Sequence, residues 1–284
     1  MSFYCIVENK HSTDTSLKYL KKSCEEKNIK FIPIEVENFN FTNKINLTKN
    51  DLFYRVKTGS KARIIESFLL NEEVSSFYTN PDYSFINKDL QDIIYYKNNL
   101  PIPKTINYLP KNKELLKKYV EHLGGFPIVI KALGGSHGVG VMRIDSMESL
   151  ISIIDFFNSK KFEYIKTDFK LSEFIDHNEQ ARINVLGDKV IASTCNIKHS
   201  SEFRLNINIK KEIKEYPKEI NQIAIKAVHS LGIEFGGVDI MIDKNNKPYV
   251  SEVNFPCNFS KAQEFTGIDI SGMMIDYLIK KSKK

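Results

Sequence analysis

Two acidic segments near the C-terminal end hold the residues best suited to chemistry. The first, 237–243, contains Asp239, and the second, 248–254, contains Glu252 and Asn254. Both segments mix apolar and polar residues in the manner of strands, and a polar turn separates them. Glu252 and Asn254 are two residues apart, so on a strand their side chains leave the same face.

The turn between the segments decides which side chains meet. If it is a two-residue turn at 245–246, counting outward places Asp239 opposite Glu252. Two carboxylates in that position destabilise a sheet, and a divalent cation with oxygen ligands would resolve the conflict. We therefore predict that Asp239, Glu252 and Asn254 hold magnesium, with manganese an acceptable substitute. Ordinary acidic residues on a solvent-facing strand edge are the alternative.

A glycine-rich segment, 134–140, directly follows an apolar run that carries a single cation, Lys131. Backbone N–H groups in such a segment can approach a phosphate closely, and a lysine adds a point charge. The segment is not a Walker A loop, and a strand rather than a helix is expected after it. It favours a flap over a nucleotide, although a plain turn is the alternative. The flap residues predicted to bind the nucleotide are Gly135, Ser136, Gly138 and Gly140.

Alternating strands and helices must position these groups. Residues 1–86 read as a small α/β unit with a parallel sheet. Its strands are expected at 3–7, 31–36 and 52–55, and its helices at 13–27 and 61–70.

The remainder reads as two α+β units, 87–170 with the glycine flap and 171–284 with the acidic hairpin. Asp145 and Glu148 have the spacing of a capping box ahead of a helix at 150–157. Further helices are expected at 88–97, 114–122, 217–231 and 271–281. Strands are expected at 127–132, 141–144, 171–175, 181–186, 189–195, 238–242 and 249–253.

Composition narrows the class of protein. The 284 residues are 42% hydrophobic, the formal net charge is +6, and no apolar run is long enough to span a membrane. The basic residues are spread out, which favours a small anionic ligand over nucleic acid. Four scattered cysteines suggest reduced thiols rather than a zinc site, and no signal peptide is visible. We expect a cytoplasmic protein with no nucleic-acid or membrane partner.

The order and spacing of several motifs resemble the ATP-grasp fold and, within it, the RimK-like ligases. The resemblance covers about residues 86–281, while the N-terminal unit agrees only in general architecture. It implies an α/β and α+β fold with an N-terminal pre-ATP-grasp domain. The motifs are Lys131 with its glycine loop, Glu173-Phe-Ile, Gly237-Val-Asp239, Glu252-Val-Asn254 and Thr266-Gly-Ile-Asp-Ile270.

The resemblance implies an ATP-dependent ligase that forms a C–N bond between a carboxylate and an amine through an acyl phosphate. An amino acid would be added to a small-molecule or peptide acceptor. The resemblance also implies a homo-dimer or homo-tetramer, as family members often form. It further implies that Lys88 and Lys131 bind phosphates, and that Glu173 and Phe174 contact adenine. Catalytic positions that line the acyl-phosphate region match Arg182, Arg204 and Asn206.

Some positions depart from the family pattern. Near the ribose, where the family often has an Asp, this chain has Gln180, with Glu179 beside it. Asn254 is followed closely by Pro256-Cys257 where a Pro-Gly pair is common. Two alternatives stay open: a regulatory module that binds nucleotide without ligation, and a peptide-modifying macrocyclase.

Overall fold

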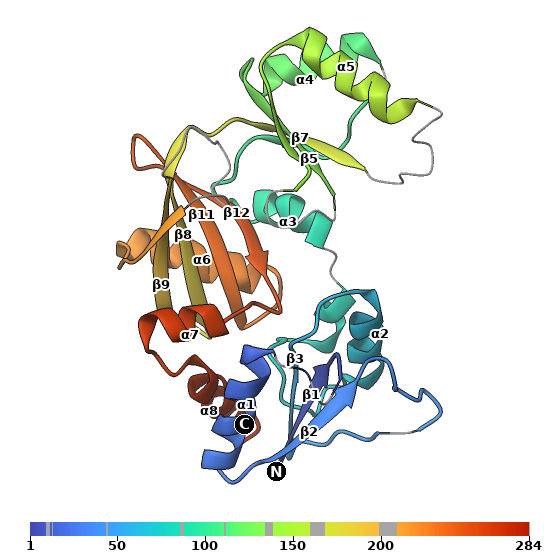
Figure 1. The fold of residues 1–284 in the computed structure, drawn as a ribbon, viewed down its shortest axis with the longest axis vertical. Helices are drawn as coiled ribbons and strands as arrows, with labels where there is room; N and C mark the ends of the chain where they lie inside the picture. The colour runs from blue at the N-terminus through green and yellow to red at the C-terminus, as the bar shows by residue number, and fades with distance from the viewer. Residues whose placement is uncertain are drawn as a thin grey trace.

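Three β-sheets and the helices that cover them make up the chain (Figure 1). The structure, a computed structural model, describes residues 1–9, 12, 14–43, 45–85, 88–110, 112–133, 139–159, 168–198 and 209–283. No helix within these ranges is long and apolar enough to cross a membrane.

The N-terminal unit is a parallel sheet, as predicted. Its strand order is β2-β1-β3, and helix α1 begins after Asp14, whose carboxylate accepts from the backbone N–H of Ser16 at 2.8 Å. Leu17, Leu20 and Cys24 recur at helical spacing on α1 and are buried. The elements are β1 (Ser2–Val7), α1 (Thr15–Glu26), β2 (Lys30–Glu35), β3 (Asp51–Arg55), α2 (Ser60–Leu69) and the short 3-10 helix η1 (Pro81–Phe85).

The central sheet is antiparallel, with strand order β4-β7-β5-β6 and helices α4 and α5 over one face (Figure 1). Ile128, Ile130 and Leu171 alternate onto that face and pack in the core with both helices. Lys131, which follows Ile130, and Lys170, which precedes Leu171, therefore leave the opposite face. The elements are β4 (Thr105–Ile106), α4 (Lys113–His122), β5 (Ile128–Ala132), β6 (Val141–Ile144), α5 (Met147–Asn158) and β7 (Phe169–Glu173).

The capping box predicted ahead of α5 is wrong. The helix begins at Met147, and its N-cap is Ser146, whose hydroxyl accepts from the backbone N–H of Ser149 at 3.2 Å. Asp145 instead accepts from the Arg143 guanidinium at 2.9 Å. A serine one residue later was the better cap because its hydroxyl reaches the third N–H of the helix.

The C-terminal sheet has five antiparallel strands in the order β10-β9-β8-β11-β12, with α6 on its apolar face. Before it, α3 follows a 3-10 turn and packs beside β12 (Figure 1). The helix α7 was not predicted. The elements are η2 (Lys88–Leu90), α3 (Gln91–Lys97), β8 (His177–Leu186), β9 (Lys189–Lys198), β10 (Ile209–Ile213), α6 (Lys218–Ser230), β11 (Phe235–Asp243), β12 (Pro248–Asn254), α7 (Ser260–Thr266) and α8 (Ile270–Lys281).

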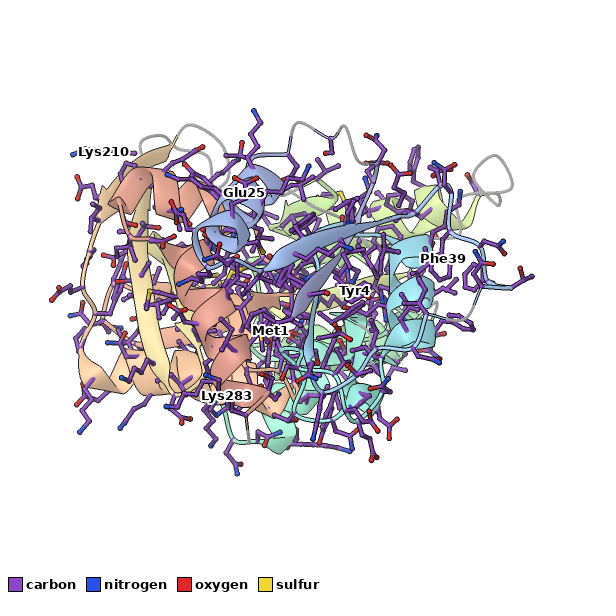
Figure 2. The ribbon with its side chains drawn as sticks, turned by 90° about the horizontal axis from the view of Figure 1, so that it is seen from below. Met1, Tyr4, Glu25, Phe39, Lys210 and Lys283 are labelled. Carbon is purple, nitrogen blue, oxygen red and sulfur yellow. The ribbon has the colours of Figure 1, made fainter. Side chains whose placement is uncertain are left out.

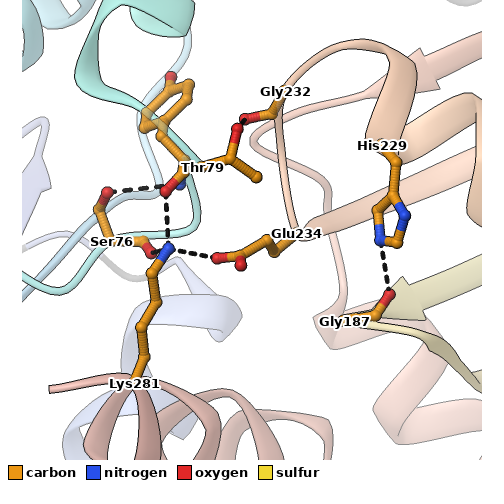
Figure 3. A network of polar contacts seen from close by, with 8 residues as sticks. Ser76, Thr79, Gly187, His229, Gly232, Glu234 and Lys281 are labelled. Atoms are coloured by element: carbon orange, nitrogen blue, oxygen red, sulfur yellow. Dashed lines mark hydrogen bonds and ion pairs between the residues drawn. The ribbon is translucent and has the colours of Figure 1, made fainter. Parts of the chain in front are cut away.

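The last helix returns to the N-terminal unit and joins it to the C-terminal sheet. Helix α8 packs on α1, and one hydrophobic core holds residues from both units. The ammonium of Lys281 lies between Ser76 and Glu234 (Figure 3). It donates to the carbonyl oxygens of Ser76 at 3.0 Å and Tyr78 at 2.7 Å, and it pairs with Glu234. These contacts fix the N-terminal unit against the sheet that carries the acidic hairpin.

The two chain ends lie close together, with Met1 and Lys283 neighbours in Figure 2 and the ends adjacent in Figure 1. Lys210 of β10 and Phe39, which follows β2, lie at opposite margins of the molecule (Figure 2).

The division of the chain into units at residues 86 and 170 remains a prediction. Strand β7 spans residue 170 and belongs to the central sheet, so sheet membership favours a second boundary after Glu173.

Candidate active site

The face of the C-terminal sheet opposite α6 carries the acidic hairpin. Val238 and Val253 point into the core under α6, so alternation sends Asp239, Glu252 and Asn254 to the other face. Asp239 is buried, whereas Glu252 and Asn254 are half-buried. The structure therefore brings the three predicted metal ligands together.

The turn of this hairpin differs from the two-residue turn predicted at 245–246. The backbone N–H of Asp243 donates to the carbonyl of Lys247 at 3.1 Å, which leaves a three-residue loop. Asn246 closes that loop in the left-handed region, with φ of 61°. Asparagine tolerates this conformation better than most residues do. Only glycine is better suited to the last position of such a loop.

A second irregularity restores the predicted pairing. The longer loop pairs Ile242 with Pro248, one residue away from the register counted from the sequence. A bulge at Ser251 then shifts the register back, so that Asp239 lies opposite Glu252. The predicted pair is confirmed, but two deviations that cancel produce it.

Positive and polar groups offset the two carboxylates. The Arg182 Nε lies 2.7 Å from Asp239 Oδ1, and the two residues are cross-strand partners on β8 and β11. The Asn254 amide nitrogen donates to both Glu252 Oε1 (3.0 Å) and Asp239 Oδ2 (3.3 Å). An electropositive group thus lies between the carboxylates, at the place where a cation would bind.

This donor set fits a hard divalent ion that also has other oxygen ligands. A half-turn of the Asn254 amide would present its oxygen beside the two carboxylates. Within the described part of the chain, no cluster of three or more His, Cys, Asp or Glu side chains could hold a metal by itself. A metal at Asp239 and Glu252 would need phosphate or water oxygens as well, which is the usual manner of binding magnesium.

The polar face of the central sheet carries two lysines. Lys131 on β5 and Lys170 on β7 are cross-strand partners, and Lys170 pairs with the buried Asp92 of α3. Burial lowers the pKa of Lys131, and the neighbouring charge of Lys170 lowers it further, while Asp92 and Glu252 oppose the shift. The charge of Glu252 therefore favours the protonated form of Lys131.

This arrangement predicts opposite pH shifts for two variants. Lys170→Met removes a like charge, so the pKa of Lys131 should rise and the alkaline loss of kcat/KM for ATP should move to higher pH. Asp92→Asn removes a favourable charge, so the pKa of Lys131 should fall and the alkaline loss of kcat/KM should move to lower pH. The measurement is the pH profile of kcat/KM for ATP. Shifts in the same direction, or none, would contradict this account of Lys131.

The glycine flap is described only at its end. Gly140 has φ of 79°, its carbonyl accepts from the backbone N–H of Ala132 at 2.9 Å, and a Cβ there would lie 2.8 Å from the Ala132 Cβ. Only glycine fits that close approach without a shift of the backbone. Outside the described residues lie Gly135, Ser136, Gly138, Arg204 and Asn206, as does the side chain of Lys88.

The remaining predicted residues lie at the edges of the two sheets. Glu173 ends β7, and its backbone N–H donates to the backbone carbonyl of Lys104 at 2.9 Å. The ring of Phe174 lies 4.8 Å from the Arg143 guanidinium carbon. Gln180 is on β8 two residues before Arg182 and so leaves the same face. Their roles toward adenine and ribose stay predictions.

Sequence reasoning missed three polar residues beside the site, namely Gln91, Asp92 and Lys170. Each is held by a partner far away in the chain, and only the fold brings these partners together. Lys170 lies in a strand of alternating apolar and polar residues, Phe169–Glu173, so nothing in the local sequence distinguishes it from a solvent-facing lysine.

Comparison with known proteins agrees with this geometry. A "Probable alpha-L-glutamate ligase" of Legionella pneumophila is 30% identical over 187 residues, which are 64% of this chain and 60% of that protein. The matched stretch thus spans less than two thirds of that relative.

Two solved structures share the fold over nearly their whole length. The ATP-grasp ligase PsnB, complexed with a minimal precursor, Mg and ADP, has a TM-score of 0.71 at 14% identity, covering 99% of this chain and 97% of that one. The D-alanine–D-alanine ligase of Bacillus anthracis, complexed with ATP, has a TM-score of 0.69 at 19% identity with the same coverage. Residues 87–278, more than half of the chain, match the model of the RimK-like ATP-grasp domain, and the chain therefore belongs to this family, which uses ATP.

Proposed function

We propose that this chain is an ATP- and magnesium-dependent carboxylate–amine ligase. The observation that supports this most is the pairing of Asp239 with Glu252 across β11 and β12, with Arg182 2.7 Å from Asp239. The lysine face of the central sheet is connected to this hairpin through α3, because Asp92 pairs with Lys170 and the preceding Gln91 donates to the carbonyl of Val253 on β12. Cations and metal-binding carboxylates in one place are the parts that phosphoryl transfer requires.

The proposed reaction has two steps. A carboxylate oxygen of the first substrate attacks the γ-phosphorus of ATP, and ADP leaves. The amine nitrogen of the second substrate then attacks the acyl carbon, phosphate leaves, and the nitrogen loses a proton to give an amide. The names of the relatives favour an amino acid as one substrate and a peptide or small molecule as the other.

The acidic hairpin, Lys131 and Arg182 would each have a defined part in this reaction. Magnesium, when bound, would neutralise charge on the phosphates and hold them in position. Asp239, Glu252 and Asn254 would hold that ion, and manganese would be accepted by the same oxygen donors. Lys131 would place a positive charge against a phosphate, and Arg182 would face the transferring group while it orients Asp239.

Phosphate release against a substrate panel tests the proposal. The panel pairs amino acids with acidic small molecules and peptides, and mass spectrometry identifies each product. Release of ADP and phosphate should require a carboxylate and an amine together. If ATP binds but no pair of substrates releases phosphate, a nucleotide-binding regulatory module becomes the better description. A product cross-linked within one peptide would identify a macrocyclase.

A further inference from the structure

A buried glutamine at the start of α3 bonds to the strand that carries two predicted metal ligands. The Gln91 side-chain nitrogen donates to the carbonyl of Val253 at 2.8 Å, and its oxygen accepts from the backbone N–H of Val253 at 3.1 Å. Val253 lies between Glu252 and Asn254 on β12. Gln91 therefore holds the two peptide groups that connect Val253 to these two residues.

The position of β12 in the sheet explains why such a contact is needed. It is the edge strand in the order β10-β9-β8-β11-β12, and no strand of the described ranges pairs with its outer side. The carboxamide of Gln91 takes the place of a neighbouring peptide group at Val253, and the carbonyl of Pro101 accepts from Val250 at 2.8 Å on the same strand. An edge strand held at two points has less freedom to shift than a free edge does.

A second buried side chain orients the carboxamide. The Tyr95 hydroxyl, one helical turn after Gln91, donates to the Gln91 oxygen at 2.9 Å. That oxygen therefore has two donors and the amide nitrogen faces a carbonyl, which is the only orientation that satisfies all three partners. The side chains of Gln91 and Tyr95 are both buried, so water does not compete for these hydrogen bonds.

The neighbouring residue makes the equivalent contact with the other sheet. Asp92 pairs with Lys170, which lies opposite Lys131 on the central sheet. Two consecutive residues of α3 thus join the strand with the carboxylates to the strand beside Lys131. The first turn of α3 connects the two polar faces at the point where a nucleotide would lie between them.

We propose that Gln91 is a positioning residue for the metal ligands, acting through Val253 on Glu252 and Asn254. The inference rests on the proposed magnesium site. Its effect should appear in the metal dependence of the reaction, because a released β12 edge would let the two oxygen donors move apart. Residues that orient metal ligands commonly change metal affinity or activity by about 10- to 100-fold when they are replaced.

The test compares Gln91→Leu with a matched variant, Gln263→Leu. Gln263 on α7 also bonds to a backbone N–H, that of Ser271 at 2.9 Å, but does not contact β12 through this bond. The measurements are the half-saturating Mg²⁺ concentration for turnover and the affinity for ADP with the metal chelated. Gln91→Leu should raise the former about tenfold or more and leave the latter unchanged, whereas Gln263→Leu should change neither.

Equal half-saturating Mg²⁺ concentrations in the two variants would overturn the inference. A loss of metal-free ADP affinity in Gln91→Leu as large as its rise in half-saturating Mg²⁺ would also overturn it. If Gln91→Leu does not fold, Tyr95→Phe decides, since it removes only the bond that orients the carboxamide. A rise of about threefold in half-saturating Mg²⁺ then supports the inference, and no rise overturns it. Glu252→Gln separates the two proposals: if it leaves Mg²⁺ dependence intact, the metal site itself is wrong.

Discussion

Glu252→Gln is expected to lower turnover by at least about 100-fold while the protein stays folded. The substitution removes one of two carboxylates that face each other across β11 and β12. The amide oxygen of a glutamine can still accept from Asn254, which now donates to Glu252 at 3.0 Å. The loss should therefore come from metal binding and not from local structure.

The free energy of unfolding should not fall together with turnover. Like charges directly opposite on a sheet repel each other, so Glu252→Gln should leave the free energy of unfolding unchanged or slightly higher. A matched control is Glu219→Gln, an exposed residue in the first turn of α6, which covers the other face of this sheet. The measurements are turnover and denaturant unfolding. If turnover of Glu252→Gln is close to that of Glu219→Gln, the assignment of Glu252 as a metal ligand is wrong.

Lys131→Met is expected to lower kcat/KM for ATP by about 100- to 1,000-fold, because it removes a point charge placed against the phosphates. Methionine has a similar length and fits the half-buried end of β5 without the cost of burying an ammonium. Stability should therefore hold or rise. Burial lowers the pKa of Lys131, so its charged form is held at a cost that methionine does not carry.

The control for Lys131→Met is Lys117→Met, an exposed lysine of α4, the helix on the opposite face of the central sheet. That variant should retain kcat/KM within about a factor of two, since a solvated surface charge contributes little. Steady-state kinetics and ADP affinity measure both variants. Equal values for Lys131→Met and Lys117→Met would show that Lys131 does not contact the nucleotide.

Local patterns were enough to predict most elements of the fold. Alternation and helical spacing placed the parallel N-terminal sheet, and the helix expected at 114–122 is α4. Short helices are harder, because α7 has only seven residues and buries few of them. Its start also lacks a capping side chain, so little in the sequence marks it.

The site was predictable where its residues are neighbours on one hairpin. Asp239 and Glu252 were paired correctly although the loop length was not, because the bulge at Ser251 compensated. Bulges follow from packing across the whole sheet, which a count of residues does not include. The contacts of Gln91 with Val253 and of Asp92 with Lys170 join distant parts of the chain, so no local pattern could reveal them.

The most direct test of the ligase account follows an oxygen atom. A carboxylate substrate found in the panel is labelled with oxygen-18 in its carboxyl group, and the released phosphate is analysed by mass spectrometry. An acyl phosphate forms its P–O bond with a carboxylate oxygen and loses that oxygen when the amine attacks carbon. One labelled oxygen in the phosphate is the predicted result. The other labelled oxygen should remain in the amide. Amide product formed together with unlabelled phosphate would contradict the account, because the lost carboxyl oxygen would then have left by another route.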